Sequence, residues 1–412
     1  MLTNYLKIAW RVLLRRKFFT FISLFGISLT LVVLLAATAM LDAVFAPRAP
    51  ETRAARTLGI YQLAMHGPQV SWSGTVGYAF LDRTLRGLPH VERCALFTVQ
   101  QTALSYPGGR KVSSYLKHAD GEFWRILDFD FLEGGPYTSA DEAAANPVAV
   151  INETTRRRYF GGGPALGKPF EIDGQRFRVV GVVRDVPIVR IVPFADVWVP
   201  ISTARDSNYR HATTGNFMAI LLARSRADFP AIKSEYQARM ARMELPDPKL
   251  YSRFEGGADT QFEALARFIF GDEGSTTHAP QLAGLLLLGM VLFMLVPTLN
   301  LVNINLSRIL DRASEIGVRK AFGASSRTLT GQFLVENLVL TLVGGAIALA
   351  LAAPLLAALN RSGLIPYAQF GLNLRVFAYG MAIAVFFALL SGVYPAWKMS
   401  RLQPAAALGG RS

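Results

Sequence analysis

The chain has 412 residues with 43 basic and 29 acidic side chains, a formal net charge of +14, and a mean hydropathy of +0.30. A basic chain indicates nucleic acid or a membrane surface as a partner. Because 51% of the residues are hydrophobic and only 17% are charged, we exclude nucleic acid and favour a membrane. The single Cys94 excludes an intrachain disulfide framework and a metal site built from clustered cysteines.

Four long apolar stretches predict transmembrane helices, because about 20 helical residues are needed to cross the hydrocarbon core of a bilayer. They occupy residues 18–41, 282–305, 330–358 and 376–397. The first has a rival interpretation as a cleavable signal peptide, since Ala37, Thr38 and Ala39 resemble a cleavage site. Its apolar run exceeds the ~7–15 residues of a signal peptide, and we therefore favour an anchored helix.

Residues 1–17, ahead of the first stretch, predict an amphipathic helix at the membrane surface. Lys7, Arg11 and Arg15 recur every four residues as one cationic stripe, and Trp10 lies on the apolar side. The simpler interpretation is a topology anchor beside anionic lipid, and the alternative adds lateral contact with a partner subunit.

Residues 42–281 predict a large extracytoplasmic α+β domain, with one lobe or two. Apolar clusters between turn residues predict strands, and two longer stretches predict helices. The strands are Ala95–Leu104, Val148–Ile151, Phe177–Val183 and Phe217–Ala223, and the helices are Asn152–Phe160 and Asp228–Glu244.

One segment of this domain, Gly162–Pro169, has the glycine and lysine spacing of a Walker A loop. Such a loop needs Ser or Thr after its lysine, a strand before it and a helix after it. Here Pro169 follows the lysine, a predicted helix precedes the segment, and ATP is not available outside the cell. We interpret the segment as a turn, and the sequence offers no standard hydrolase motif and no catalytic residue.

The excess positive charge predicts the orientation in the membrane. Residues 1–17, 307–332 and the tail from Lys398 together hold 13 basic and 2 acidic residues, whereas residues 43–281 hold 28 and 25. By the positive-inside rule, both termini and the segment 306–329 are cytoplasmic, as is the tail 398–412. The domain at residues 42–281 and the short link at 359–375 then lie outside.

Three polar residues fall at the second and third predicted helices. Asn300 and Asn303 predict hydrogen bonds between helices. Glu336 lies near the cytoplasmic start of its helix, where pairing with an Arg or snorkelling to the interface is a simpler explanation than a transport path.

The cytoplasmic segment 306–329 predicts a docking site. Gly323 can end one short helix, and Ser325 or Ser326 can begin the next. A solvated hairpin does not explain Ile316 and Phe322, which are apolar residues on a helix with little core of its own. A helix that presents both apolar and basic side chains suits a groove in a partner protein.

The segment Ala313–Ala324 (ASEIGVRKAFGA), the QFLVEN that follows and the tail Ser391–Leu408 resemble the permease family that includes MacB, LolC, LolE and FtsX. The block Val148–Asp185 is similar to the extracytoplasmic core domain of MacB-type members, whereas the resemblance is weak from about residue 187 to 281. The resemblance implies a bacterial inner-membrane ABC transporter permease with four transmembrane helices, which pairs with a second permease copy as a homodimer or heterodimer.

The resemblance also implies that the segment docks on a cytoplasmic ABC ATPase through seven residues: Glu315, Ile316, Gly317, Arg319, Lys320, Phe322 and Gly323. MacB carries this ATPase ahead of its first span, and only 17 residues precede the span here, so we expect a separate ATPase polypeptide. ATP and magnesium would bind to that partner, and we expect no cofactor or metal on this chain.

The implied function is export of a small molecule, peptide or lipid-linked substrate, driven by movement of the outer domain. A periplasmic adaptor and an outer-membrane channel are further expected partners, beside membrane lipid. The alternatives are an FtsX-like regulator of a cell-wall hydrolase and a membrane sensor, although a sensor would need a cytosolic output domain.

Overall fold

The computed structural model describes residues 14–15, 17–272, 274, 276–311, 318 and 325–400. The chain divides into two compact units. The outer unit is formed by Val44–Ala283 together with the four residues Ile365–Ala368, and the helical unit is formed by the rest. A short piece of chain from far along the sequence is therefore part of the outer unit.

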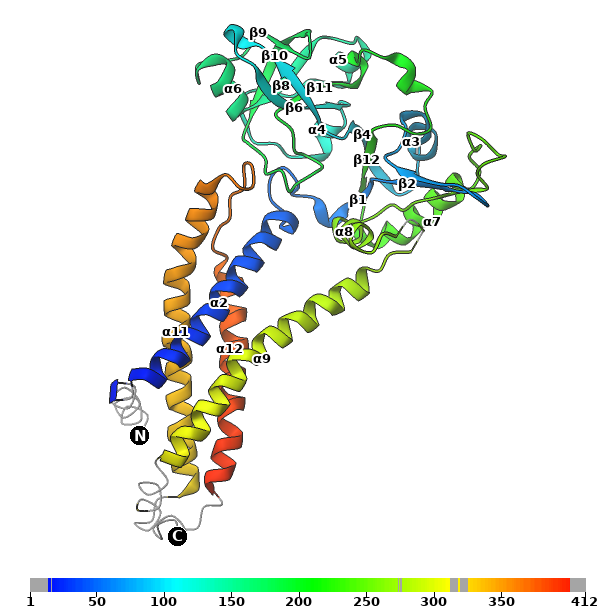
Figure 1. Cartoon of the computed structure of the whole chain (residues 1–412). Helices are drawn as coiled ribbons and strands as arrows, with labels where there is room; N and C mark the ends of the chain where they lie inside the picture. The colour runs from blue at the N-terminus through cyan, green and yellow to red at the C-terminus, as the bar shows by residue number, and fades with distance from the viewer. Residues whose placement is uncertain are drawn as a thin grey trace. The chain divides into compact units, whose positions relative to one another are not determined.

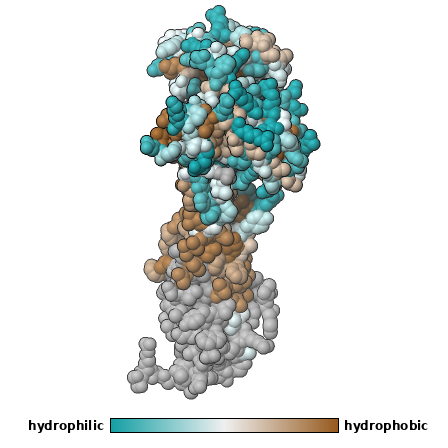
Figure 2. Space-filling model, turned by 90° about the vertical axis from the view of Figure 1, so that its right-hand side faces the viewer, coloured by the Kyte–Doolittle hydropathy of each residue, from teal (hydrophilic) through white to brown (hydrophobic). Residues whose placement is uncertain are grey.

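In its described part, the helical unit contains four long helices (Figure 1): α2 (Lys17–Phe45), α9 (Ala279–Asp311), α11 (Ser326–Ser362) and α12 (Leu374–Ser400). α2, α11 and α12 share a buried cluster that includes Ile27, Leu31 and Leu340. Gly344 permits close packing here, because a Cβ atom on it would lie 2.7 Å from Cγ2 of Ile27. Figure 2 shows a largely hydrophobic surface over the described part of this unit and a mostly hydrophilic one over the outer unit.

Two of the helices are long and apolar enough to cross a membrane over the described residues, at Thr20–Phe45 and Thr330–Ser362. The apolar parts of the other two are shorter, at Ala279–Phe293 and Leu374–Leu390. The described residues thus contain candidate membrane helices before and after the outer unit in the sequence, and the count of four spans remains a prediction.

The outer unit is organised around a ten-stranded mixed sheet with the order β1-β12-β4-β6-β11-β8-β10-β7, to which β5 and β9 add at β6 and β10. The pairs β8–β10 and β6–β11 are parallel, and the other pairs are antiparallel. Its strands are β1 (Thr57–Ile60), β4 (Val91–Thr98), β5 (Gln101–Ser105), β6 (Val112–Ala119), β7 (Phe131–Gly134), β8 (Val148–Asn152), β9 (Pro169–Ile172), β10 (Gln175–Val183), β11 (Val197–Pro200) and β12 (Phe217–Ala223).

A second, three-stranded sheet and short helices complete the outer unit. The sheet has the order β13-β2-β3, with β2 (Leu63–His66), β3 (Ser71–Gly74) and β13 (Arg253–Glu255). The helices are α3 (Tyr78–Leu85), α4 (Phe123–Ile126), α5 (Ser139–Ala143), α6 (Glu153–Phe160), α7 (Phe229–Met240) and α8 (Gln261–Phe270). Single 3-10 turns occur at Ala54–Arg56, Pro107–Gly109, Ile201–Thr203, Ser207–Arg210 and Arg226–Asp228.

Most of the predicted elements of this domain are confirmed. The strands predicted at Val148–Ile151, Phe177–Val183 and Phe217–Ala223 correspond to β8, β10 and β12. The single strand predicted at Ala95–Leu104 is wrong, because the chain turns after Thr98 and forms two strands, β4 and β5. The predicted helix Asp228–Glu244 is shorter at both ends, as α7.

The glycine-rich segment is a turn, as its sequence predicts. Asn152 caps α6 by accepting a hydrogen bond from Thr155 N, and α6 ends at Gly161, whose φ of 62° is left-handed. The chain then enters β9 and turns at Asp173 and Gly174 into β10. A helix therefore precedes the segment and a strand follows it, which is the reverse of the order in a Walker A loop.

Candidate functional site

The predicted ATPase-docking residues lie outside the described residues, all seven of them from Glu315 to Gly323. Their neighbour Val318 is described and is exposed. Ser325 begins α11 as its N-cap, because its hydroxyl accepts a hydrogen bond from Thr328 N at 3.2 Å. The prediction that one of two serines starts this helix is thus confirmed, and the docking role stays a prediction.

The residues predicted at the membrane surface and within the helices are only partly described. Lys7, Trp10 and Arg11 lie outside the described residues, and Arg15 is helical and exposed. Asn300 and Asn303 lie in α9, but their side chains are outside the description. Glu336 is buried in α11 and accepts a hydrogen bond from Nε2 of Gln332 at 3.1 Å.

Three buried polar clusters of the outer unit, which the sequence does not reveal, hold the segments that lead into the long helices. The first follows α2. Arg190 is 5% exposed, and its guanidinium donates to the carbonyl oxygens of Ala46 at 2.8 Å and Arg48 at 3.2 Å. It also lies 3.3 Å from Oε2 of Glu51. A single side chain thus binds three points of the segment that leaves α2, and we call this set the Arg190 cluster.

Burial governs the electrostatics of this cluster. It raises the pKa of Glu51 from 4.5 to about 7, while Arg190 and the buried Lys117 act in the opposite direction. Burial likewise lowers the pKa of Lys117 to about 7. The Lys117 ammonium donates to the carbonyl oxygen of Ile191 at 2.8 Å and to that of Val192 at 2.5 Å. These bonds tie β6 to the loop that carries Arg190.

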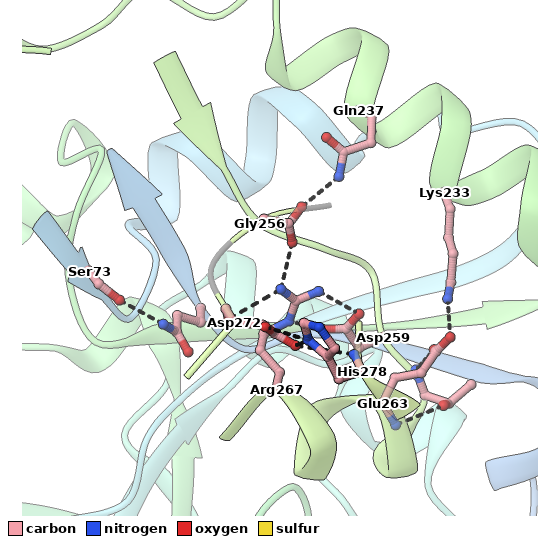
Figure 3. A network of polar contacts seen from close by, with 12 residues as sticks. Ser73, Lys233, Gln237, Gly256, Asp259, Glu263, Arg267, Asp272 and His278 are labelled. Atoms are coloured by element: carbon pink, nitrogen blue, oxygen red, sulfur yellow. Dashed lines mark hydrogen bonds and ion pairs between the residues drawn. The ribbon is translucent and has the colours of Figure 1, made fainter. Parts of the chain in front are cut away.

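The second cluster precedes α9 and centres on Arg267 of α8, which is 4% exposed (Figure 3). Its Nε atom donates to Oδ2 of Asp259 at 2.8 Å, and its Nη2 atom donates to Oδ1 at 3.1 Å. This bidentate pair is the strong form of an Arg–carboxylate contact. Asp259 in turn exchanges two backbone hydrogen bonds with Gly59 of β1. The segment before α9 is thus tied to the edge of the large sheet.

The third cluster holds the short link of the chain between α11 and α12. The hydroxyl of Tyr367 donates to Oδ1 of Asp196 at 2.7 Å, and the amide of Ile188 donates to the carbonyl oxygen of Pro366 at 3.2 Å. Asp196 is 2% exposed and also accepts from the Tyr115 amide and from Nδ2 of Asn152, both at 2.9 Å. The short link between the last two helices is therefore built into the outer unit.

The three clusters are suited to mechanical connection. Arg190 and Arg267 each pair with a buried carboxylate, and Asp196 accepts three hydrogen bonds, so these contacts are costly to break. Among the described residues no group of three His, Cys, Asp or Glu side chains could hold a metal ion. In the sequence these residues are isolated charged or aromatic residues, and some of their partners are distant, such as Glu51 for Arg190 and Asp196 for Tyr367.

Two family models match the chain. The MacB-like periplasmic core domain matches residues 20–239, and the FtsX-like permease C-terminal domain matches residues 287–404. Apolar helices that flank a periplasmic domain define a membrane permease. The chain belongs to the MacB-like periplasmic core domain family and is an ABC transporter permease of the MacB and FtsX type.

The chain is similar to several named relatives. It is 27% identical to the pyoverdine export ATP-binding/permease protein PvdT of Pseudomonas syringae pv. tomato, over 99% of this chain and 59% of that protein. It is 25% identical to the uncharacterized ABC transporter permease YvrN of Bacillus subtilis, over 83% and 81%. It is 27% identical to the macrolide exporter MacB of Wolinella succinogenes, over 73% and 44%. The chain thus spans less than two thirds of both export proteins.

Two solved structures are also similar to parts of the chain. The extracellular domain of the transporter YknZ from Gram-positive bacteria is 16% identical with a TM-score of 0.36, over 48% of this chain and 98% of that one. The periplasmic region of MacB from Actinobacillus actinomycetemcomitans is 14% identical with a TM-score of 0.37, over 53% and 94%.

Proposed function

We propose that the chain is the non-catalytic permease subunit of an ABC-type exporter and that it transmits the work of a cytoplasmic ATPase to its outer domain. The observation that carries the proposal is that the outer unit includes Ile365–Ala368, the link between α11 and α12. The outer unit is then attached to the long helices after α2, before α9 and between α11 and α12, with a buried cluster at each attachment.

These attachments favour a mechanical role for the outer domain. A single flexible tether would let the domain move independently of the helices, whereas three well-anchored segments pass on any relative movement of the helices. The names of the relatives PvdT and MacB support export as the outcome of this movement. The proposed substrate is a small molecule, a peptide or a lipid-linked molecule. The proposed further partners are a second permease copy, a periplasmic adaptor and an outer-membrane channel.

The ATPase is proposed to be a separate polypeptide that docks on Glu315–Gly323. The relative YvrN supports this part of the proposal, because it is named a permease and the chain covers 81% of its length. A helix with alternating apolar and charged residues suits a groove in such a partner. ATP and magnesium would bind there, and this chain would contribute no catalytic group.

The test is ATPase stimulation in nanodiscs that contain the full chain and an ABC ATPase encoded beside it. We expect Glu315→Arg and Arg319→Glu each to abolish both co-purification and stimulation. Arg158→Glu, at an exposed position of α6, is the matched control and should leave both unchanged. Failure of the unaltered chain to bind or stimulate any ABC ATPase would refute the proposal, and capture of a cell-wall hydrolase without transport would favour the regulatory alternative.

A further inference from the structure

Helix α8 of the outer unit exposes apolar side chains and buries a charged one, which is the opposite of an ordinary surface helix. Phe268 is 84% exposed, and Ile269 and Phe270 beside it are also exposed. Arg267, by contrast, is buried. An amphipathic surface helix normally turns its apolar face inward and its charged face to water. The reversal indicates that α8 borders an apolar environment.

The polar side chains of α8 are all engaged with other elements of the outer unit. Gln261 donates from Nε2 to Oε1 of Glu51 at 2.5 Å, and Lys233 of α7 donates from Nζ to Oε1 of Glu263 at 2.6 Å. Arg267 forms the bidentate pair with Asp259, as Figure 3 shows. These contacts fix which side of α8 faces inward, so the exposure of Phe268–Phe270 is a property of the fold.

Both ends of α8 lie beside points where a long apolar helix joins the outer unit. The ring of Phe262 packs edge-on against Phe45, the last residue of α2, with 6.0 Å between centroids. The ring of Phe270 lies 5.4 Å from that of His278, the residue immediately before α9. A ten-residue helix is about 15 Å long. Helix α8 therefore runs along the surface of the outer unit from which both α2 and α9 depart.

The exposed apolar surface of α9 begins close to its first residue. The run of exposed leucines begins at Leu285, which is about 9 Å of helical rise beyond the start of α9 at Ala279. The polar interfacial layer of a bilayer is roughly 5–8 Å thick on each side of the hydrocarbon core, and aromatic side chains are enriched there. The start of α9, beside Phe270, is thus separated from the first exposed leucine of α9 by about the thickness of this layer.

We propose that Phe268, Ile269 and Phe270, which we call the α8 anchor, insert into the outer-leaflet interface and seat the outer unit on the membrane. Lipid is the occupant because the two ends of α8 contact Phe45, which ends the apolar helix α2, and His278, which precedes the apolar helix α9. The only basic residue of α8, Arg267, is buried in its pair with Asp259. Insertion therefore depends on apolar contact and not on anionic headgroups.

The experiment measures the depth of a spin label in the full chain, reconstituted in phosphatidylcholine nanodiscs after Cys94→Ala. The label is placed by Phe268→Cys, with Leu285→Cys as the lipid-facing reference. Leu166→Cys, an exposed apolar position on the connection from α6 to β9, is the control in water. We expect the oxygen-to-nickel collision ratio of the label at residue 268 to be several-fold higher than at residue 166 and no higher than at residue 285.

Two results in phosphatidylcholine nanodiscs would overturn the α8 anchor. One is nickel accessibility at residue 268 equal to that at residue 166, which means that the patch faces water. The other is protection from both reagents together with spin–spin broadening between copies, which means that a second chain covers it. Replacing half of the lipid by phosphatidylglycerol should leave the oxygen-to-nickel ratio unchanged, and insertion only with the anionic lipid would also contradict the proposal.

Discussion

The guanidinium of Arg190 illustrates how one residue can secure a junction of the chain. Its planar fork reaches two carbonyl oxygens and one carboxylate, which belong to a segment more than 130 residues earlier in the sequence. An ammonium group cannot reproduce this geometry, because it presents its donors around a single point. The buried charge is tolerated because its partners replace the hydration that it loses.

Replacement of Arg190 by Met should lower the free energy of unfolding of the outer unit by roughly 3–5 kcal/mol, because Glu51 loses its counter-charge in a buried setting. Arg190→Lys should recover little of this loss. The measurement is thermal unfolding of the full chain in detergent, followed by near-ultraviolet circular dichroism. Arg158→Met is the exposed control, and equal effects of the two Met substitutions would contradict the role of the cluster.

The raised pKa of Glu51 predicts how the stability of the outer unit depends on pH. Because its pKa rises from 4.5 to about 7 on folding, the native state binds more protons than the unfolded state between these values. The free energy of unfolding should therefore carry a contribution that falls as the pH rises from 4.5 to 7. In Glu51→Gln this contribution disappears, so the melting temperature should decline less over that range. An unchanged slope would show that Glu51 titrates normally.

A few contacts hold the link Ile365–Ala368 in the outer unit. It has no regular secondary structure, yet Tyr367 and Pro366 bond to the loop between β10 and β11. The ring of Tyr367 also lies 6.3 Å from that of Phe194. Because Asp196 already holds β6 and β8 through Tyr115 and Asn152, the link is joined to the centre of the large sheet.

Removal of the Tyr367 hydroxyl should loosen this element without unfolding the domain. Tyr367→Phe loses one hydrogen bond to a buried carboxylate, which is worth about 1–3 kcal/mol, while Asp196 keeps its other two donors. Hydrogen exchange should become faster at the backbone amides of residues 365–370 and remain unchanged in β6 and β8. Tyr106→Phe, at an exposed position, is the control and should alter neither region.

At the scale of the whole molecule, the net charge of +14 separates into a strongly basic set of short segments and a nearly balanced outer unit. This asymmetry predicts the orientation, because basic residues remain on the cytoplasmic side. The proposed transmission of force requires this orientation, since the outer domain and the predicted docking segment must then lie on opposite sides of the membrane.

Orientation can be tested by labelling cysteines in spheroplasts with a membrane-impermeant maleimide, after Cys94→Ala. Tyr106→Cys in the outer unit and Ser362→Cys at the end of α11 should react without lysis, because both positions are exposed and are predicted to lie outside. Ser325→Cys should react only after lysis. Labelling of residues 325 and 362 from the same side would refute the predicted crossing by α11.

Local pattern was sufficient for much of the fold. Apolar runs located the long helices, and apolar clusters between turn residues located β8, β10 and β12, because burial and backbone preference act within one segment. The turn that separates β4 from β5 escaped prediction, since Val99 and Gln100 carry no Gly or Pro signal. The docking segment was predicted from its motif and composition. The seven residues of its predicted site lie outside the described part of the chain.

The sequence by itself determined the class of protein, because hydropathy, charge asymmetry and short motifs are properties of contiguous residues. Only the tertiary structure decided where the outer domain is held. Arg190 meets Glu51, Tyr367 meets Asp196, and Phe270 meets His278 through folding. The reversed exposure of α8 likewise depends on partners from other elements, so no periodicity within the helix could indicate it. Buried polar contacts between distant segments leave no local pattern, because each partner alone is an ordinary charged or aromatic residue.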